Sequence, residues 1–300
     1  MILKIVIILL SLFTIISAHP GRTNKDGCHT DKRTGEYHCH GDKDKKEVSE
    51  ESEDTDEEEY EESTNDEDDD ESDEVVKKND SNIVKVDYDG FTVWVDCSKR
   101  GAIKFQYNAQ RDTGNAERLK SFYKDKNVPE ECQQTSTKPY GKKYDRGHLV
   151  PANHLDHSEL AIKQSNFMTN ILPQAANMNR GAWLLTEEIV ECYRDIEELL
   201  VIGGVIWGDD PSDDFFEKSH GVKTPDAYWK VVIRGSRNGE KVIAWIIPNS
   251  QEAKRKNLDK YLVTIEEIEK ITGEKIPVAD YSKYEKPSTS WMIPRGCNKG

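Results

Sequence analysis

The chain has 300 residues, 35% hydrophobic and 33% charged, with a mean hydropathy of −0.81. This composition is too polar for a uniformly folded chain, and it excludes a polytopic membrane protein because the one long apolar run, residues 5–16, is shorter than the about 20 residues of a span. The net charge of −15 comes from one segment, Glu47 to Glu74, which holds 19 acidic and no basic residues. The rest of the chain holds 42 basic and 38 acidic residues. The acidity of the whole chain therefore does not exclude a nucleic-acid partner.

Residues 1–18 predict a secretory signal peptide. Lys4 supplies the positive end, residues 5–16 form the apolar core, and Ser17 and Ala18 are small residues suited to a cleavage site. An uncleaved membrane anchor is the alternative, for which the apolar run is short. The sequence therefore predicts a secreted, extracellular protein without membrane contact after cleavage.

Residues 19–46 form a small segment rich in cysteine and histidine. Two interpretations remain open, a disulfide between Cys28 and Cys39 that closes a hairpin, or a transition-metal site for zinc or copper. The five potential ligands are Cys28, His29, His38, Cys39 and His40. The segment resembles the short modules named for a Tyr-His-Tyr-His signature, with Cys39 where the second Tyr would be.

Residues 47–82 form an acidic linker that we expect to be disordered and extended, because like charges repel and almost no apolar residue is available for burial. A sharper hypothesis is that this segment mimics a polyanion and occupies a basic cleft of the next domain.

Residues 83–280 form the main domain, followed by a C-terminal tail at 281–300. Alternating apolar residues predict a hairpin of residues 91–95 and 103–107, and apolar runs predict strands at 201–207, 228–233 and 242–247. Helices are expected at 179–200 and 265–271. Strands outnumber helices without regular alternation, which indicates an α+β fold around a mainly antiparallel sheet. We expect four cysteines to pair within this domain: Cys97, Cys132, Cys192 and Cys297.

The residues suited to chemistry lie in one stretch that begins at Asp145-Arg146-Gly147-His148 and continues to Glu187. His148 is a base that titrates near neutral pH, so activity is expected to fall below about pH 6.5. Amide and carboxylate oxygens suit Mg2+, and arginines bind phosphate. Together these groups suit phosphodiester hydrolysis.

Asn179 and Glu187 are eight residues apart on the predicted helix. In a regular α-helix this places them about 80° away from alignment and about 12 Å apart along the axis. Both could bind a cation directly only if the helix bends. Asn179 as the direct ligand and Glu187 acting through a metal-bound water is the easier geometry.

Simpler interpretations exist for each residue. Asn179 could be a helix N-cap, and Arg146 a partner in a surface ion pair. Glu187 could be an exposed helix carboxylate, as we expect for Glu188 and Glu191. Three histidines are expected to have no role in the site, with His154 and His157 on the surface and His220 in a loop.

The combination resembles the DNA/RNA non-specific endonucleases, the group that includes Serratia nuclease and endonuclease G. The resemblance covers roughly residues 85–275 and rests on Asp145 to His148, on Asn170 in Thr-Asn-Ile-Leu-Pro-Gln, and on Asn179-x-Gly-x-Trp183 with Glu187 four residues further on. It implies a ββα-metal fold, in which a hairpin presents His148 and the following helix carries Asn179.

By position, the resemblance makes His148 the general base, with Arg146 and Glu187 as the other catalytic residues. It makes Asn179 the direct Mg2+ ligand, with Mn2+ able to substitute, and Glu187 a ligand through water. Substrate binding is assigned to Arg111, Arg146 and Asn170. The chain departs from the family at Glu191, where an arginine is often found, and the assignment of Arg111 rests on position alone.

The sequence therefore predicts a secreted, Mg2+-dependent endonuclease that cuts DNA and RNA, leaving 5′-phosphate and 3′-hydroxyl ends. The alternative is a secreted protein that binds nucleic acid or metal but is inactive or narrowed to another phosphodiester. The sequence leaves open whether the protein is a monomer or a homodimer.

Overall fold

The computed structural model describes residues 28–30, 37–39, 82–235 and 239–299. The chain divides into two compact units, residues 1–74 and 75–300. In the first unit, strands β1 (Cys28–Thr30) and β2 (Tyr37–Cys39) pair antiparallel, with the backbone of Cys28 opposite that of Cys39. The predicted signal peptide, the acidic linker and His40 lie outside the described residues.

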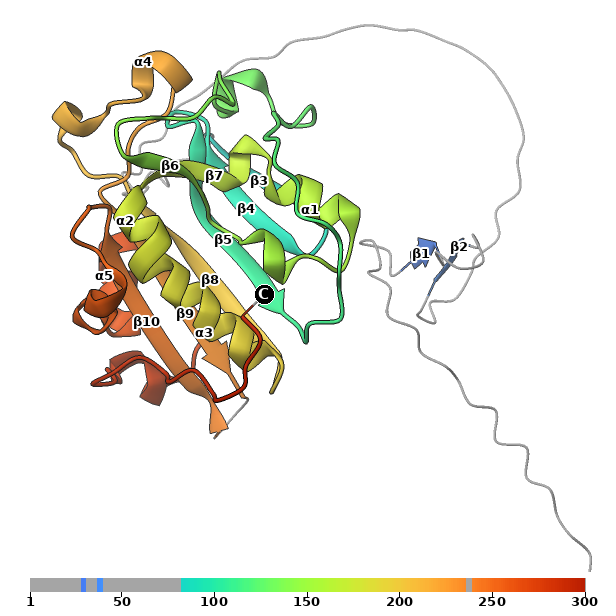
Figure 1. The fold of residues 1–300 in the computed structure, drawn as a ribbon, viewed down its shortest axis with the longest axis vertical. Helices are drawn as coiled ribbons and strands as arrows, with labels where there is room; N and C mark the ends of the chain where they lie inside the picture. The colour runs from blue at the N-terminus through green and yellow to red at the C-terminus, as the bar shows by residue number, and fades with distance from the viewer. Residues whose placement is uncertain (1–27, 31–36, 40–81, 236–238, 300) are drawn as a thin grey trace, which may run out of the picture. The chain divides into compact units, whose positions relative to one another are not determined.

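A six-stranded antiparallel sheet in the order β10-β9-β8-β5-β4-β3 forms the centre of the second unit (Figure 1). The predicted hairpin and the three predicted strands are confirmed. The strands are β3 (Ile83–Asp87), β4 (Phe91–Asp96), β5 (Gly101–Ala109), β8 (Leu199–Ile206), β9 (Ala227–Arg234) and β10 (Lys241–Pro248).

A second, two-stranded sheet joins β6 (Tyr144–His148) to β7 (Ile171–Ala175), and a helix follows β7 directly. This helix consists of α2 (Ala176–Met178), a π-helical turn (Asn179–Trp183) and α3 (Leu184–Arg194). Two strands and the helix together make the expected ββα unit. The helix ends at residue 194 rather than at 200, because the chain turns at 195–198 and enters β8, whose apolar residues complete the sheet.

The sheet buries a layer of side chains on each face. On one face, Val201 and Val232 pack in the core that includes Trp183 of the ββα helix. On the other face, Ile202 and Val231 pack with α5 (Ile265–Thr272). The helix of the ββα unit crosses the first face in Figure 1. The central sheet is therefore the platform that supports the helix expected to bind the cation.

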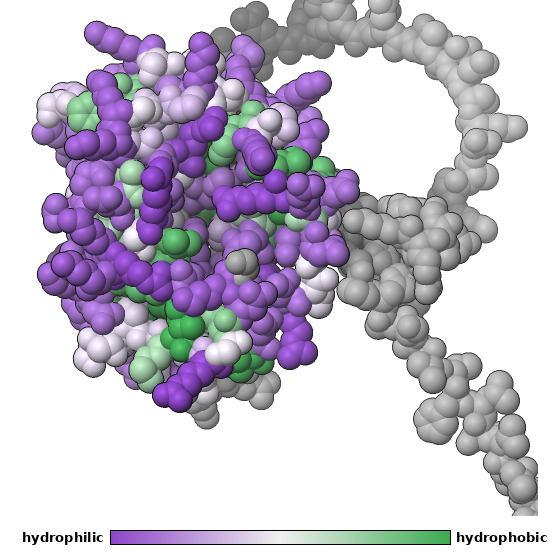
Figure 2. All heavy atoms as spheres, viewed as in Figure 1, coloured by the Kyte–Doolittle hydropathy of each residue, from purple (hydrophilic) through white to green (hydrophobic). Residues whose placement is uncertain are grey.

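Short elements complete the fold. The remaining α-helices are α1 (Glu159–Ser165) and α4 (Glu217–His220), and 3-10 turns occur at Glu130–Cys132, Ala152–His154, Met168–Asn170, Pro211–Asp213, Arg255–Tyr261 and Asp280–Tyr284. Among the described residues, no helix combines the length and apolar character needed to cross a bilayer. Hydrophilic side chains cover most of the face shown in Figure 2.

Two disulfides join distant segments of this unit, Cys97–Cys132 and Cys192–Cys297. They confirm that the four cysteines of the main domain pair with one another. The second bond ties the C-terminal segment to α3.

Candidate active site

The start of the helix is bound directly to strand β6. The carboxylate of Asp145 accepts a hydrogen bond from Nδ2 of Asn179 at 3.0 Å. It also accepts two hydrogen bonds from the guanidinium of Arg180, at 2.8 and 2.6 Å. Asp145 is three residues before His148 on β6, so the start of the helix is attached to the strand that carries His148.

The π-helical turn changes the angular relationship between Asn179 and Glu187. The amide of Leu184 donates to the carbonyl of Asn179, five residues earlier, instead of following the regular four-residue pattern. One extra residue in a turn removes about 100° of rotation, which offsets the about 80° misalignment of an unbroken α-helix. Asn179 and Glu187 therefore lie on nearly the same side, two turns apart.

The motif residues Gly181 and Trp183 hold this turn in place. A Cβ at Gly181 would lie 2.9 Å from the backbone nitrogen of Arg255 and 3.2 Å from the carbonyl oxygen of Ala253, so only glycine allows this loop to approach. Trp183 is fully buried, and its indole nitrogen donates to the carbonyl of His148 at 3.1 Å. Gly181 thus allows the helix to approach the loop at residues 253–255, and Trp183 attaches the helix to strand β6.

Asn166, at the C-terminal end of α1, orients the ring of His148. Its Oδ1 lies 2.8 Å from Nε2 of His148, and its Nδ2 donates to the carbonyls of Leu119 and Ser121. Because Nδ2 is committed to two acceptors, the amide presents its oxygen to the ring, so Nε2 carries the proton. Nδ1, which has no hydrogen-bond partner among the described residues, is then the basic nitrogen.

The environment of His148 keeps it neutral at physiological pH. The side chain is buried, and burial is the main cause that lowers its pKa to about 4; the hydrogen bond with Asn166 opposes this shift, and the charges of Arg118 and Arg146 add to it. The expected loss of the base near pH 6.5 is therefore wrong for this structure. The imidazole remains unprotonated well below that pH.

Glu187 lies in the same electrostatic environment as His148. Burial raises the pKa of its carboxyl, and the cations of Lys230 and Arg118 oppose that shift. Lys230 is itself fully buried, with its ammonium 2.8 Å from Oγ1 of Thr186 and 3.7 Å from the centroid of the Trp183 ring. The charge of Arg118 thus acts on both His148 and Glu187.

The donor set fits a hard divalent cation with many bound waters. Asp145 fixes Nδ2 of Asn179, so the carbonyl oxygen Oδ1, which has no hydrogen-bond partner in the described part of the chain, is available as a ligand. Glu187 adds a carboxylate two turns along. Among the described residues no cluster of three His, Cys, Asp or Glu side chains could hold a metal. Mg2+ is the metal that usually keeps several waters.

Arg146 is held next to His148 but away from Asp145. Its guanidinium donates to the carbonyl of Thr137 at 2.7 Å and lies 3.9 Å from the centroid of the Phe122 ring. The Phe122 ring is in turn 5.7 Å from the His148 ring. Arg146 is therefore packed on an aromatic surface rather than engaged in an exposed ion pair, and its charge acts on the base.

The side chain of Asn170 is enclosed by the protein and is not open to substrate. It is fully buried; its Oδ1 accepts from the amide of Val150, and its Nδ2 donates to the carbonyls of Val150 and Ser165. The structure contradicts the expected role in substrate binding. Asn170 instead braces the backbone that follows His148, and the asparagine that contacts the base is Asn166.

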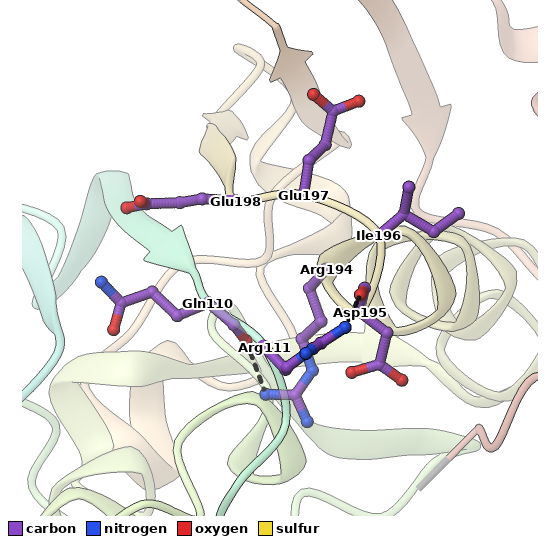
Figure 3. Close-up of a pocket in the computed structure, with 7 residues that line it drawn as sticks. All are labelled: Gln110, Arg111, Arg194, Asp195, Ile196, Glu197 and Glu198. Carbon is purple, nitrogen blue, oxygen red and sulfur yellow. Dashed lines mark hydrogen bonds between the residues drawn. The ribbon is translucent and has the colours of Figure 1, made fainter.

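Arg111 lies at the C-terminal end of α3. It donates to the carbonyl of Asp195 at 3.1 Å, beyond the C-terminal end of α3, and it lines a pocket of about 480 Å³ with Arg194 (Figure 3). The arginine whose charge acts on His148 and Glu187 is Arg118, which is exposed. The expectation for Arg111 is corrected accordingly, because residues 110–122 form an irregular loop whose path the sequence pattern does not reveal.

Glu191 and His154 are buried, contrary to the surface positions expected for them. The Glu191 carboxylate accepts two hydrogen bonds from Arg194 at 3.0 and 2.7 Å and one from Asn153 at 3.0 Å, and it lies 3.2 Å from Nε2 of His154. Nδ1 of His154 lies 2.8 Å from the hydroxyl of Tyr107. This buried network joins α3 to β5 and to the segment that follows His148; it consists of Glu191, its partners Arg194, Asn153 and His154, and Tyr107, which contacts His154.

The exposure expected for Glu188 and the loop position expected for His220 are also wrong, while the surface position of His157 is confirmed. Glu188 is largely covered, with hydrogen bonds at 2.7 Å from Arg255 and an ion pair at 2.9 Å with Lys299. His220 is buried at the end of α4, with Nε2 2.9 Å from the carbonyl of Lys138. His157 is on the surface, as expected.

Comparisons with known proteins agree with this geometry. A family model described as DNA/RNA non-specific endonuclease matches residues 71–284. A nuclease of Nostoc sp. is 30% identical over 172 residues, which cover 53% of this chain and 60% of that protein. Human mitochondrial endonuclease G is 26% identical over 198 residues, covering 62% and 66%. The Serratia marcescens nuclease is 29% identical over 140 residues, covering 44% and 50%.

The chain spans about half to two thirds of the length of these relatives. A solved structure described as the EndoG/EndoGI complex, with the mechanism of EndoG inhibition, matches with a TM-score of 0.53 and 18% identity over 63% of this chain and 83% of that chain. At this identity the likeness establishes the fold, with its mainly antiparallel sheet and ββα unit.

Proposed function

Because the chain belongs to the DNA/RNA non-specific endonuclease family, we propose that it hydrolyses phosphodiester bonds of DNA and RNA with Mg2+ as cofactor and Mn2+ as a substitute. The observation that carries the proposal is the contact between Asn166 and His148, which leaves Nδ1 as a neutral base on the strand that anchors Asn179. Contacts to phosphate rather than to bases would explain a lack of sequence preference.

In the proposed reaction, Nδ1 of His148 takes a proton from a water molecule. The water oxygen attacks phosphorus in line, the bond to the 3′ oxygen breaks, and the products are a 5′-phosphate and a 3′-hydroxyl. Trp183 donates to the backbone carbonyl of His148, and Asn166 binds its ring, so together they fix the position of the imidazole. Arg146 and Arg118 supply positive charge for the phosphate.

Asn179 would hold the cation directly and Glu187 would hold it through water. When bound, Mg2+ supplies charge neutralisation at the scissile phosphate and at the departing oxygen. Asp145 and the π-helical turn fix the positions of both ligands before substrate arrives.

We also propose that the protein acts outside the cell. The two disulfides of the main domain are the support for an oxidising compartment, and residues 1–18 are the proposed signal.

A plasmid-nicking assay with Mg2+ or with EDTA tests the proposal on wild type and His148→Ala. Wild type should nick DNA and degrade RNA only with Mg2+, and His148→Ala should lose about 100-fold to 10,000-fold in rate while it still binds DNA. Nicking by His148→Ala at the wild-type rate would exclude His148 as the base. Binding without cleavage by wild type would favour an inactive nucleic-acid-binding protein.

A further inference from the structure

A turn with unusual backbone angles leads directly into strand β6. The amide of Tyr144 donates to the carbonyl of Gly141 at 3.0 Å, and the two central residues have positive φ values, 52° at Lys142 and 65° at Lys143. These features define a type I′ turn, which strongly favours Asn-Gly. Lysine is disfavoured in the left-handed region because its Cβ crowds the backbone. Turn geometry alone therefore does not explain the two lysines.

The surrounding structure imposes this conformation. The carbonyl of Lys143 accepts hydrogen bonds from the amide of Ala176, at 2.8 Å, and from Nε2 of Gln251, at 2.9 Å. The turn is thus attached to the first residue of α2. Strained backbone that is held so firmly is concentrated at functional sites.

Both lysine side chains are exposed and neither ammonium group has an acidic partner among the described residues. The Lys142 ammonium lies 5.3 Å from the centroid of the Phe215 ring, and Phe215 is 41% exposed. An aromatic ring attracts a cation but does not neutralise its charge. The turn therefore presents two uncompensated positive charges next to an aromatic surface.

The turn directly precedes β6, the strand that ends at the proposed base, His148. Tyr144 and His148 are the two ends of β6, four residue steps apart, or about 13 Å at the usual strand rise. That distance corresponds to roughly four base-pair steps of a duplex. The loop at residues 209–214 is acidic; within it Asp214 is paired with Lys223 at 3.1 Å, and the charge of Asp213 acts on Tyr144, next to the turn.

We propose that Lys142 and Lys143 form a subsite for the sugar–phosphate backbone of the nucleic acid, roughly four nucleotides from the cleaved bond. The proposal rests on the proposed nuclease function and adds the statement that longer substrates gain binding at this turn. Contacts of this type carry no sequence preference and weaken with salt.

The test replaces both lysines with the sequence that the turn favours, Lys142→Asn with Lys143→Gly. This variant should fold with an equal or higher melting temperature, because the strain is relieved. Binding to a duplex of about 30 base pairs is measured by fluorescence anisotropy in EDTA, so that no cleavage occurs. The slope of log K against log salt should become shallower by about 2, one for each lost phosphate contact.

A matched control removes the same charge away from the turn. Lys241 begins β10, Lys270 is on α5, both are exposed, and neither is paired with an acidic group in the described part of the chain. Lys241→Asn with Lys270→Asn should leave the salt slope at the wild-type value. Equal slopes for all three proteins would overturn the proposal, and so would equal losses in both variants.

A length series separates this subsite from the reaction itself. The ratio of wild-type to variant kcat/KM should rise as duplex substrates lengthen from about 4 to about 30 base pairs, and a ratio independent of length would contradict the subsite. If the Asn-Gly variant folds poorly, Lys142→Gln with Lys143→Gln replaces it. A wild type that binds through this turn but never cleaves would refute the proposed function and leave the subsite standing.

Discussion

Oδ1 of Asn166 lies 2.8 Å from Nε2 of His148, and this contact decides which ring nitrogen can accept a proton. Asn166 is held in turn by the carbonyls of Leu119 and Ser121, so it also links the base to the loop that carries Arg118. One amide therefore sets the tautomer of the base and the position of a neighbouring cation.

Asn166→Asp should move the acid limb of activity to higher pH. A carboxylate beside Nε2 favours the imidazolium and should raise the pKa of His148 by about 1 to 3 pH units. In wild type burial lowers that pKa to about 4, so His148 is lost as a base only as the pH falls towards 4. Profiles of kcat/KM at saturating Mg2+ measure the difference. Asn177→Asp, an exposed change on α2, is the control, and identical acid limbs for Asn166→Asp and wild type would contradict the assignment.

Asp145→Asn should raise the Mg2+ concentration needed for half-maximal activity by about 10-fold or more, because groups that orient a ligand affect metal affinity on this scale. The change removes the charged acceptor that holds Nδ2 of Asn179. Arg180→Ala is the comparison, since it removes only the exposed partner of Asp145 and should have a smaller effect. An unchanged Mg2+ requirement in Asp145→Asn would show that Asn179 does not depend on this contact.

Gly181→Ala should destabilise the protein by about 1–3 kcal/mol, since the new methyl group meets the backbone at Ala253 and Arg255. Urea unfolding measures the change. Gly239→Ala is a suitable control because nothing lies within 4 Å of its added Cβ. If both variants unfold at the same urea concentration, the close approach at Gly181 is not a constraint.

Glu191→Leu should cost about 3–5 kcal/mol of folding free energy, because the buried Arg194 keeps only its longer ion pair, 3.4 Å to Asp112, and His154 and Asn153 also lose their acceptor. Burial by itself would raise the pKa of Glu191, but the interactions with His154 and Arg194 outweigh it and lower that pKa. Glu191→Gln keeps the shape and some hydrogen bonds and should cost less. Denaturant unfolding at pH 7 ranks the two variants, and a stable Glu191→Leu would contradict this account.

The strands were predictable because their signal is local. Alternation in residues 91–95 and apolar runs such as 242–247 predict β4 and β10, and the helix expected at 265–271 is α5, capped by Thr264 and Gly273. His148, Asn179 and Glu187 were singled out because their residue types and spacing suit the chemistry.

The residues whose positions were predicted wrongly have partners that are distant in sequence. A glutamate such as Glu191 is usually exposed, and only the meeting of α3 with residues 153 and 154 buries it. Asn166 was visible in the sequence, but its contact with His148 requires knowledge of how α1 ends beside β6. The path of the loop at Arg118 is likewise set by tertiary contacts.

The π-helical turn constrains the number of residues between Asn179 and Glu187, in addition to their identities. The turn absorbs one residue, so the eight-residue spacing wound through it is equivalent to seven residues of ordinary α-helix, whereas eight residues of ordinary helix would place the carboxylate about 80° away from the amide oxygen. Substitutions that return the turn to ordinary winding while keeping all of its residues should therefore separate the two ligands around the axis, and a further deletion of one residue there should bring them back to the same side.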